Sequence, residues 1–232
     1  AYAAAVDAFG DSFTSNDYAD RVDMLLWRGE RSDAQRLLSH LSSADRALAQ
    51  ARIALQIRQR RHLQQTIDAV PTSRADDPGF LYDRTQYRRR TGDPEGAMAI
   101  AARIDANDAP LFARSDIFKE RRLYVPRALR TGQPRLAYSL VSNSGLSSGE
   151  SFADSEWLCG WLQLRFLSQP AQAAEHFARM SANVSAPVSR SRALYWRAEA
   201  ARALGQTADA DAMLAEAARY NFTFYGQLAA TR

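Results

Sequence analysis

Few residues in this chain have side chains suited to nucleophilic, acid–base or metal chemistry. His40, His62 and His176 are its only histidines, and Cys159 is its only cysteine. A metal site needs several such ligands at short spacings, and no two histidines here stand with a carboxylate at a ligand spacing. The glycine-rich patterns that hold phosphates are also absent from the sequence. We therefore expect no metal and no cofactor.

Cys159 lies between Trp157 and Trp161 in an apolar stretch. A single cysteine excludes an intramolecular disulfide and a cysteine-based metal cluster. A reactive thiol needs a lowered pKa, whereas apolar surroundings raise the pKa of a thiol. The sequence predicts a buried, inert thiol at Cys159. The neighbouring aromatic residues recur near helical spacing, and we interpret them as core rather than as ligand platforms.

The composition is that of a protein with an ample core. The 232 residues are 46% hydrophobic and 24% charged, with a net charge of +4. Lys119 is the only lysine, so the positive charge is almost wholly arginine. Arginine richness fits an anionic partner such as nucleic acid or cell-wall polymer, but acidic residues accompany the arginines almost everywhere. We therefore favour a base-composition bias in the gene. No apolar stretch approaches the roughly 20 residues of a transmembrane helix, and the first residues lack the features of a signal peptide.

Four glycines mark a repeated unit. Each closes a helical stretch and is followed five residues later by an alanine. The pairs are Gly29 and Ala34, Gly92 and Ala97, Gly132 and Ala137, and Gly205 and Ala210. A degenerate fifth copy has Gln169-Pro170-Ala171 at its turn, with Ala174 and Phe177 behind it. Glycine accepts the left-handed backbone that ends a helix, and alanine lets the second helix approach the first closely.

The spacing of these units predicts the fold class. Gly92 and Gly132 are 40 residues apart, and Gly132 and Gly205 are 73 apart, which is about two units. A period of about 35 to 40 residues is typical of stacked helical hairpins. We expect an all-α superhelix of the tetratricopeptide kind that forms one domain over residues 1–232. The stretch between Gly29 and Gly92 should hold one more hairpin, built on Ala47–Leu63 and a following short helix, whose turn the sequence does not reveal.

Helix breakers stand where hairpins should join. The junctions are Pro71 with Asp76–Gly79, then Asn107–Pro110, and then Ala186-Pro187. The stretch Ser142–Ser151 is the longest loop candidate. Pro126 conflicts with a helix over Glu120–Leu129, and it should kink that helix or mark a later start.

The second half of the chain resembles the α-superhelical part of bacterial soluble lytic murein transglycosylases. The resemblance is densest over residues 115–232 and rests on spaced segments. These are Phe118–Arg122, Ala137-Tyr138, Trp157–Leu167, His176-Phe177, Pro187–Trp196 and Phe224–Ala229. It implies a periplasmic scaffold from a Gram-negative bacterium that positions peptidoglycan glycan strands for cleavage between N-acetylmuramic acid and N-acetylglucosamine by a lyase reaction.

In that family a lysozyme-like catalytic domain follows the segment that ends near Ala229, so the resemblance implies that this domain would lie downstream. Glu150-Ser151 is the only Glu-Ser pair here, and it lacks the segment that should follow the catalytic pair. We therefore assign no catalytic residue and expect this chain alone to be inactive. The candidate glycan contacts are five arginines: Arg88, Arg89, Arg90, Arg121 and Arg122.

Two other hypotheses come from different functional classes. The first is a stand-alone tetratricopeptide-like adaptor that binds peptide segments of partner proteins. The second is a helical-repeat RNA-binding protein. We expect no nucleic-acid partner, because the arginines do not recur at matched positions in successive repeats as a base-by-base code requires. The three consecutive arginines Arg88-Arg89-Arg90 also have a structural explanation, since cations at a helix C-terminus are favoured by the helix dipole.

Overall fold

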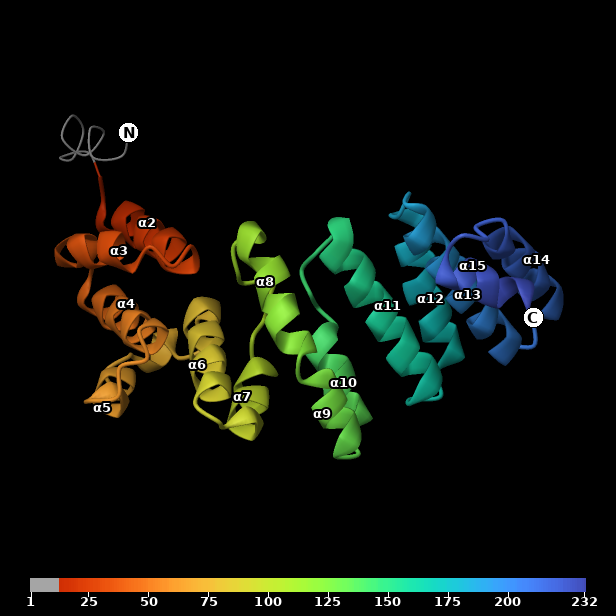
Figure 1. The fold of residues 1–232 in the computed structure, drawn as a ribbon. Coiled ribbons are helices and arrows are strands. Elements are labelled where there is room, and N and C mark those ends of the chain that lie inside the picture. The colour runs from red at the N-terminus through yellow and green to blue at the C-terminus, as the bar shows by residue number, and fades with distance from the viewer. Residues whose placement is uncertain (1–12) are drawn as a thin grey trace. The chain divides into compact units, whose positions relative to one another are not determined.

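The computed structural model describes residues 13–232, and regular structure in that range is helical, without strands (Figure 1). The all-α fold class and the hairpin solenoid predicted from the periodicity are confirmed. Contacts divide the chain into two compact units, Ala1–Ile104 and Asp105–Arg232, and each unit is described by itself. That the two units form one continuous domain stays a prediction.

The first unit consists of helical hairpins in which α2 packs on α3, α4 on α5 and α6 on α7. Its core gathers aliphatic side chains such as Val22, Leu25 and Leu38. Its elements are α2 (Ser15–Trp27), α3 (Arg31–Leu37), η2 (Leu38–His40), α4 (Ser43–Gln56), α5 (Leu63–Asp68), η3 (Thr72–Arg74), α6 (Pro78–Arg90) and α7 (Pro94–Ala101).

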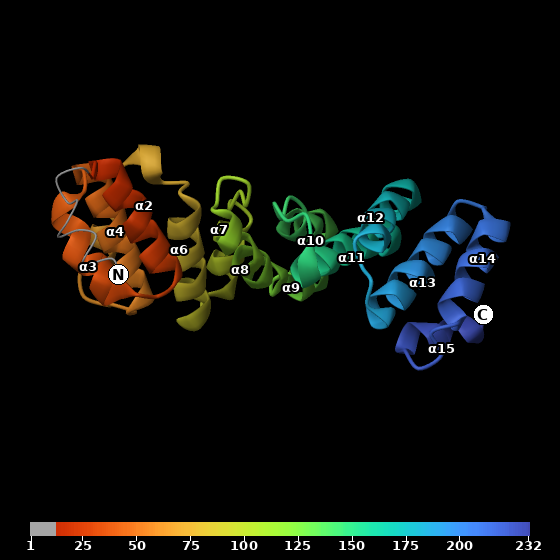
Figure 2. The same ribbon diagram turned by 90° about the horizontal axis from the view of Figure 1, so that it is seen from above.

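The second unit continues the same construction, with α11 packed on α12 and α13 on α14 (Figure 2). Its core centres on Phe177, Trp196 and Leu214. Its helices are α8 (Leu111–Arg122), α9 (Val125–Arg130), α10 (Pro134–Val141), α11 (Gly149–Arg165), α12 (Pro170–Ala182), α13 (Pro187–Ala203), α14 (Thr207–Ala218) and α15 (Phe224–Ala230).

Each predicted glycine turn has the left-handed backbone that its position requires. The φ angles are +74° at Gly29, +90° at Gly92, +70° at Gly132 and +77° at Gly205. The residue after the glycine donates its N–H to a carbonyl five residues earlier, as Asp93 does to Arg88 at 2.9 Å. This bond satisfies one of the carbonyls that the end of a helix leaves open.

Two hairpins turn at a left-handed residue that is not glycine. Arg58 has a φ of 54°, and the next residue, Gln59, donates to the carbonyl of Ala54 at 2.9 Å. Arg58 is therefore the turn that the sequence did not reveal, and α4 ends at Gln56, earlier than the expected Ala47–Leu63 helix. Ser168 has a φ of 53° and closes the degenerate copy.

The alanines that follow the turns are fully enclosed. Ala34, Ala97, Ala137 and Ala210 each have 0% exposure, as predicted. In the degenerate copy the equivalent residue is Ala173, five positions after Ser168, and it too has 0% exposure. The expected Ala174 is only partly buried, because the turn occupies Ser168 rather than the Gln169-Pro170-Ala171 segment.

Several prolines begin helices rather than interrupt them. The residue Pro126 lies in the first turn of α9, after α8 has ended at Arg122. This is the later helix start that the sequence left as one alternative. Proline is tolerated there because the first N–H groups of a helix have no partner within the helix.

Arg52 is a buried cation at the centre of the first unit, with 1% exposure. Its Nε donates to Asp83 at 2.8 Å, and it also forms an ion pair with Asp23. Its guanidinium fills the space beside Gly79, where an added Cβ would meet the Arg52 Cζ at 2.4 Å. Burial raises the pKa of Asp83, although the positive charge of Arg52 opposes that effect. The pair fixes the packing of α4 against α6.

Replacing Ala210 by leucine should lower the free energy of unfolding by about 1–3 kcal/mol, because the added methyl groups have no space between helices α13 and α14. Urea titration of the chain measures this change. Ala208 is exposed on the same helix, so Ala208→Leu should leave stability within about 0.5 kcal/mol. Equal effects of both substitutions would contradict the assigned packing.

Replacing Ser168 by glycine should raise the free energy of unfolding by about 0.5–1 kcal/mol. The left-handed backbone is strained for serine, and relief of that strain exceeds the entropy that glycine adds to the unfolded chain. Gly132→Ser is the matched reverse change, since a Cβ there meets no atom within 4 Å, and it should cost about 1 kcal/mol. Thermal melts of both variants test the pair, and a destabilised Ser168→Gly variant would refute equivalence of the two turns.

Candidate functional site

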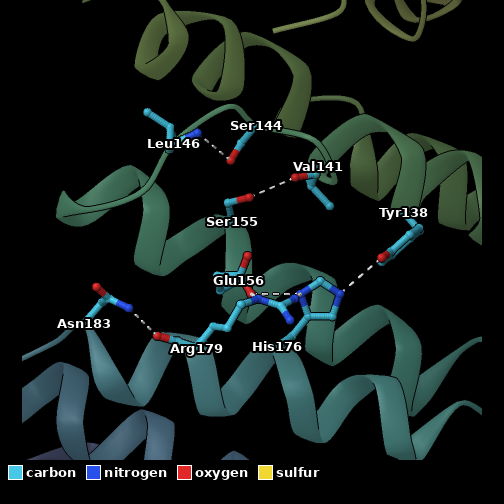
Figure 3. A network of polar contacts seen from close by, with 9 residues as sticks. All are labelled: Tyr138, Val141, Ser144, Leu146, Ser155, Glu156, His176, Arg179 and Asn183. Carbon is cyan, nitrogen blue, oxygen red and sulfur yellow. Dashed lines mark hydrogen bonds and ion pairs between the residues drawn. The ribbon is translucent and has the colours of Figure 1, made fainter. Parts of the chain in front are cut away.

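His176 is the centre of a polar cluster in the second unit (Figure 3). It lies on α12, and its ring is engaged on both sides. The Tyr138 hydroxyl on α10 is 3.1 Å from Nε2, and the Glu156 carboxylate on α11 is 2.9 Å from Nδ1. Three helices therefore each contribute one side chain to the cluster. Burial raises the pKa of Tyr138, so its hydroxyl keeps its proton at neutral pH.

Arg179 completes this cluster one helical turn after His176. Its Nε donates to Glu156 Oε2 at 2.8 Å, and its terminal nitrogen Nη2 is 2.7 Å from His176 Nδ1. The His176 Nδ1 atom donates to Glu156 in one tautomer and accepts from Arg179 in the other. The side chain of Glu156 is only 14% exposed, and the bonds from its partners compensate for the removal of its charge from water.

The cluster borders a hollow of about 590 Å³, which we call the polar hollow. Beyond the cluster residues, its walls are mostly polar. They include Asn107, Ser142, Asn143, Ser144, Ser155, Gln172 and Glu175. Amide side chains both donate and accept hydrogen bonds, so such walls are suited to a ligand with alternating donors and acceptors.

Arg114 holds the loops that form the rim of the polar hollow. Its two terminal nitrogens donate to the carbonyls of Gly145 at 2.8 Å and Asn107 at 2.9 Å. Its Nε donates to Ala109 at 3.1 Å. Gly145 has a φ of +65°, and a Cβ there would lie 2.9 Å from the Arg114 side chain. One arginine thereby fixes two segments of irregular backbone that flank the hollow.

A second hollow, of about 700 Å³, follows the same three helices toward their turns, and we call it the turn hollow. Pro134 and Leu136 line it from α10, Phe166 and Leu167 from the end of α11, and Gln169 from the start of α12. Gln163 also lines it and makes a side-chain hydrogen bond with Tyr138, which borders the polar hollow. Both hollows are lined by residues of α10, α11 and α12 and of the turns beside them, and we call the two hollows together the groove.

Cys159 also borders the polar hollow, which brings a thiol, a histidine and a carboxylate into one region. These are the residue types of a cysteine nucleophile with its base. The thiol is 1% exposed, however, and burial raises its pKa well above the usual range. Both ring nitrogens of His176 are engaged by other side chains. The thiol is therefore unreactive here, in agreement with the interpretation from sequence.

The five candidate glycan arginines lie in different surroundings. Arg121 is 3% exposed and donates to the carbonyl of Ser139, so it is not available to a polymer, and its assignment as a contact is corrected. Arg122 is exposed and pairs with Asp154 at 3.0 Å. Arg88 pairs with Asp93 at 2.6 Å, while Arg89 and Arg90 follow it at the end of α6. Contact of these four with a glycan strand has no test in the structure.

The other residues that were considered for a chemical role have structural positions. His40 stacks on Tyr18 with ring centroids 4.3 Å apart, and His62 is exposed before α5. Trp196 is buried in the core as expected, whereas Phe166 is 43% exposed. Within residues 13–232, no group of three or more His, Cys, Asp or Glu side chains is arranged to hold a metal ion.

Sequence reasoning did not find the groove. Tyr138, Glu156 and His176 are 18 to 38 residues apart, and each looks ordinary in its own helix. The available signal was the repeat itself. Along α12, Gln172, His176 and Arg179 recur at steps of four and three residues on one helical face. This polar face flanks the buried Ala173 and Phe177, and it could have been singled out.

Comparisons with known proteins identify no family for this chain. No protein-family model and no curated protein matches this chain. A solved structure described as "Functional Characterization of Pseudomonas Aeruginosa pilF" matches at 13% sequence identity, with a TM-score of 0.47. The match covers 94% of this chain and 97% of that chain.

These findings correct the resemblance to lytic murein transglycosylases, which was wrong. The structural match is to pilF, not to a transglycosylase, and neither a family model nor a curated relative supports the peptidoglycan function. The segments that carried the resemblance lie in helices and turns of the second unit. The periplasmic location followed from the same resemblance and stays a prediction. None of the helices in residues 13–232 has the length and apolar character needed to cross a membrane.

The native chain should react slowly with a disulfide reagent such as dithionitrobenzoate at pH 8. The raised pKa of Cys159 keeps the thiolate fraction below that of a free cysteine, and the fraction grows only as the pH approaches the raised value. We expect labelling at least about 100-fold slower than in guanidinium chloride, with Cys159→Ser as the blank. Rapid stoichiometric labelling of the folded chain would show an activated thiol.

Proposed function

We propose that this chain is a helical-repeat adaptor that binds an extended segment of a partner protein in the groove between α10 and α12. The proposal is supported by the groove itself, which combines the polar hollow and the turn hollow along three packed helices. Rigid helices are suited to hold contact residues in fixed positions, so that little ordering cost falls on the adaptor.

The exposed amides of the polar hollow are the single observation that carries the proposal. Asn143 and Gln172 are both exposed and line the polar hollow. Their side chains can donate to the carbonyls and accept from the N–H groups of an extended peptide.

The dimensions of the groove set the length of the segment. From Gln169 to Arg179 the wall formed by α12 spans ten residues, or about 15 Å at 1.5 Å per residue. An extended chain rises about 3.3 Å per residue. The groove therefore accommodates about five residues of a partner in extended conformation.

Panning a displayed library of random decapeptides on the 232-residue chain, followed by affinity measurement on synthetic copies, tests this function. We expect enriched peptides whose affinity falls at least tenfold in the Gln172→Trp variant, because the indole would occupy the polar hollow. Fluorescence anisotropy with labelled peptides gives the dissociation constants.

Ala178→Trp is the matched control, since Ala178 is exposed on α12 and does not line the groove. This variant should bind the same peptides as the parent. A library that shows no enrichment, or peptides that bind both tryptophan variants equally well, would rule out the groove as the binding site.

A further inference from the structure

The charged side chains that line the groove bear on which peptide segments it can bind. Two of its ionisable side chains, Glu156 and Arg179, neutralise each other through the 2.8 Å ion pair. The His176 ring is engaged by Tyr138 at Nε2 and by Glu156 at Nδ1. The charge that the groove offers to a ligand must therefore come from its remaining ionisable residues.

Arg135 and Glu175 are those residues. Arg135 lines the turn hollow and Glu175 lines the polar hollow, and both are exposed. Neither has an ion-pair or hydrogen-bond partner within the part of the chain that the structure describes. The turn hollow thus has an unpaired positive charge, and the polar hollow has an unpaired negative charge.

The turn hollow also carries the apolar contact surface. Phe166 is 43% exposed, and its ring is held edge-on against Trp161 with centroids 5.0 Å apart. Pro134, Leu136 and Leu167 complete the apolar part of the turn hollow. An aromatic ring fixed by a neighbour loses little freedom when it contacts a ligand, so it can serve as an anchor site for an aliphatic side chain.

We propose, on the basis of the proposed function, that the groove recognises a short extended segment with an acidic residue at one end and a basic residue at the other, and with an aliphatic residue next to the acidic one. The acidic side chain pairs with Arg135, the neighbouring aliphatic side chain contacts Phe166, and the basic side chain pairs with Glu175.

Two peptides of identical composition separate this pattern from simple charge attraction. Ac-Glu-Leu-Ala-Ala-Ala-Lys-NH2 places leucine beside the acid, whereas Ac-Lys-Leu-Ala-Ala-Ala-Glu-NH2 places it beside the base. Reversing the direction of binding does not make the second peptide fit. NMR titration of the isotopically labelled chain, which follows the side-chain amides of Gln163 and Gln172, gives both the affinity and the location.

We expect the first peptide to bind about three- to tenfold more tightly than the second, which is the range that one apolar contact provides, because both peptides can make both ion pairs. In the Glu175→Lys variant the lysine peptide should lose about three- to tenfold, and Ac-Glu-Leu-Ala-Ala-Ala-Glu-NH2 should gain by a similar factor. Glu150 is exposed and lies outside both hollows, so Glu150→Lys should change neither affinity beyond twofold. Circular dichroism of each variant confirms that it is folded.

The outcomes distinguish this inference from the function on which it rests. Equal binding of the two matched peptides in the groove, or tighter binding of the second, overturns the charge pattern but leaves peptide binding intact. Binding of library-selected peptides that lack this pattern, with no response to either matched peptide, overturns it as well. Failure of every peptide, including the selected library, overturns the proposed function itself.

Discussion

The left-handed turn followed by an enclosed alanine is the constraint on which the rest of the fold depends. The turn reverses the chain within a few residues, and the alanine five positions later permits close approach of the second helix. All five of these alanines, including Ala173, have 0% exposure. A larger side chain at such a position would separate the two helices, because packed interiors have few voids to absorb it. The spacing of helices, and hence the register of every surface groove, follows from this approach.

Each unit has a buried arginine, and the two arginines differ in the partners that surround their charge. Arg52 is paired with Asp83 and Asp23 and fills the space that Gly79 leaves open. Arg121 is almost as buried but has a backbone carbonyl as its hydrogen-bond partner, and burial lowers its pKa. An arginine remains charged under either condition because its ordinary pKa is above 12. The energetic cost of Arg121 differs from that of Arg52, since no carboxylate lies in an ion pair with it.

The groove is a consequence of hairpin register rather than of any local motif. Helix α11 sits between α10 and α12, so side chains from one face of each helix border the same space. The thiol, imidazole and carboxylate found there have geometry that satisfies the histidine and keeps the cysteine protonated. The same region offers exposed amides and two unpaired charges of opposite sign. This chemistry supports the proposed binding of a peptide segment.

The sequence by itself determined the helical class, the repeated turn and the buried small residue behind it. Those features depend on backbone conformation and local periodicity, which residues such as Gly92 and Ala97 express directly. It also determined that Cys159 is buried, since the apolar residues around it are its neighbours along the same helix.

Only the tertiary structure decided where the non-glycine turns fall and which side chains meet. Arg58 and Ser168 have a left-handed backbone that their residue types do not favour, so the sequence does not reveal these turns. The meeting of Tyr138, Glu156 and His176 depends on the rotation of three helices about their axes. A small change in that rotation would point each side chain elsewhere, so the groove and its charge pattern exist only once the hairpins have packed.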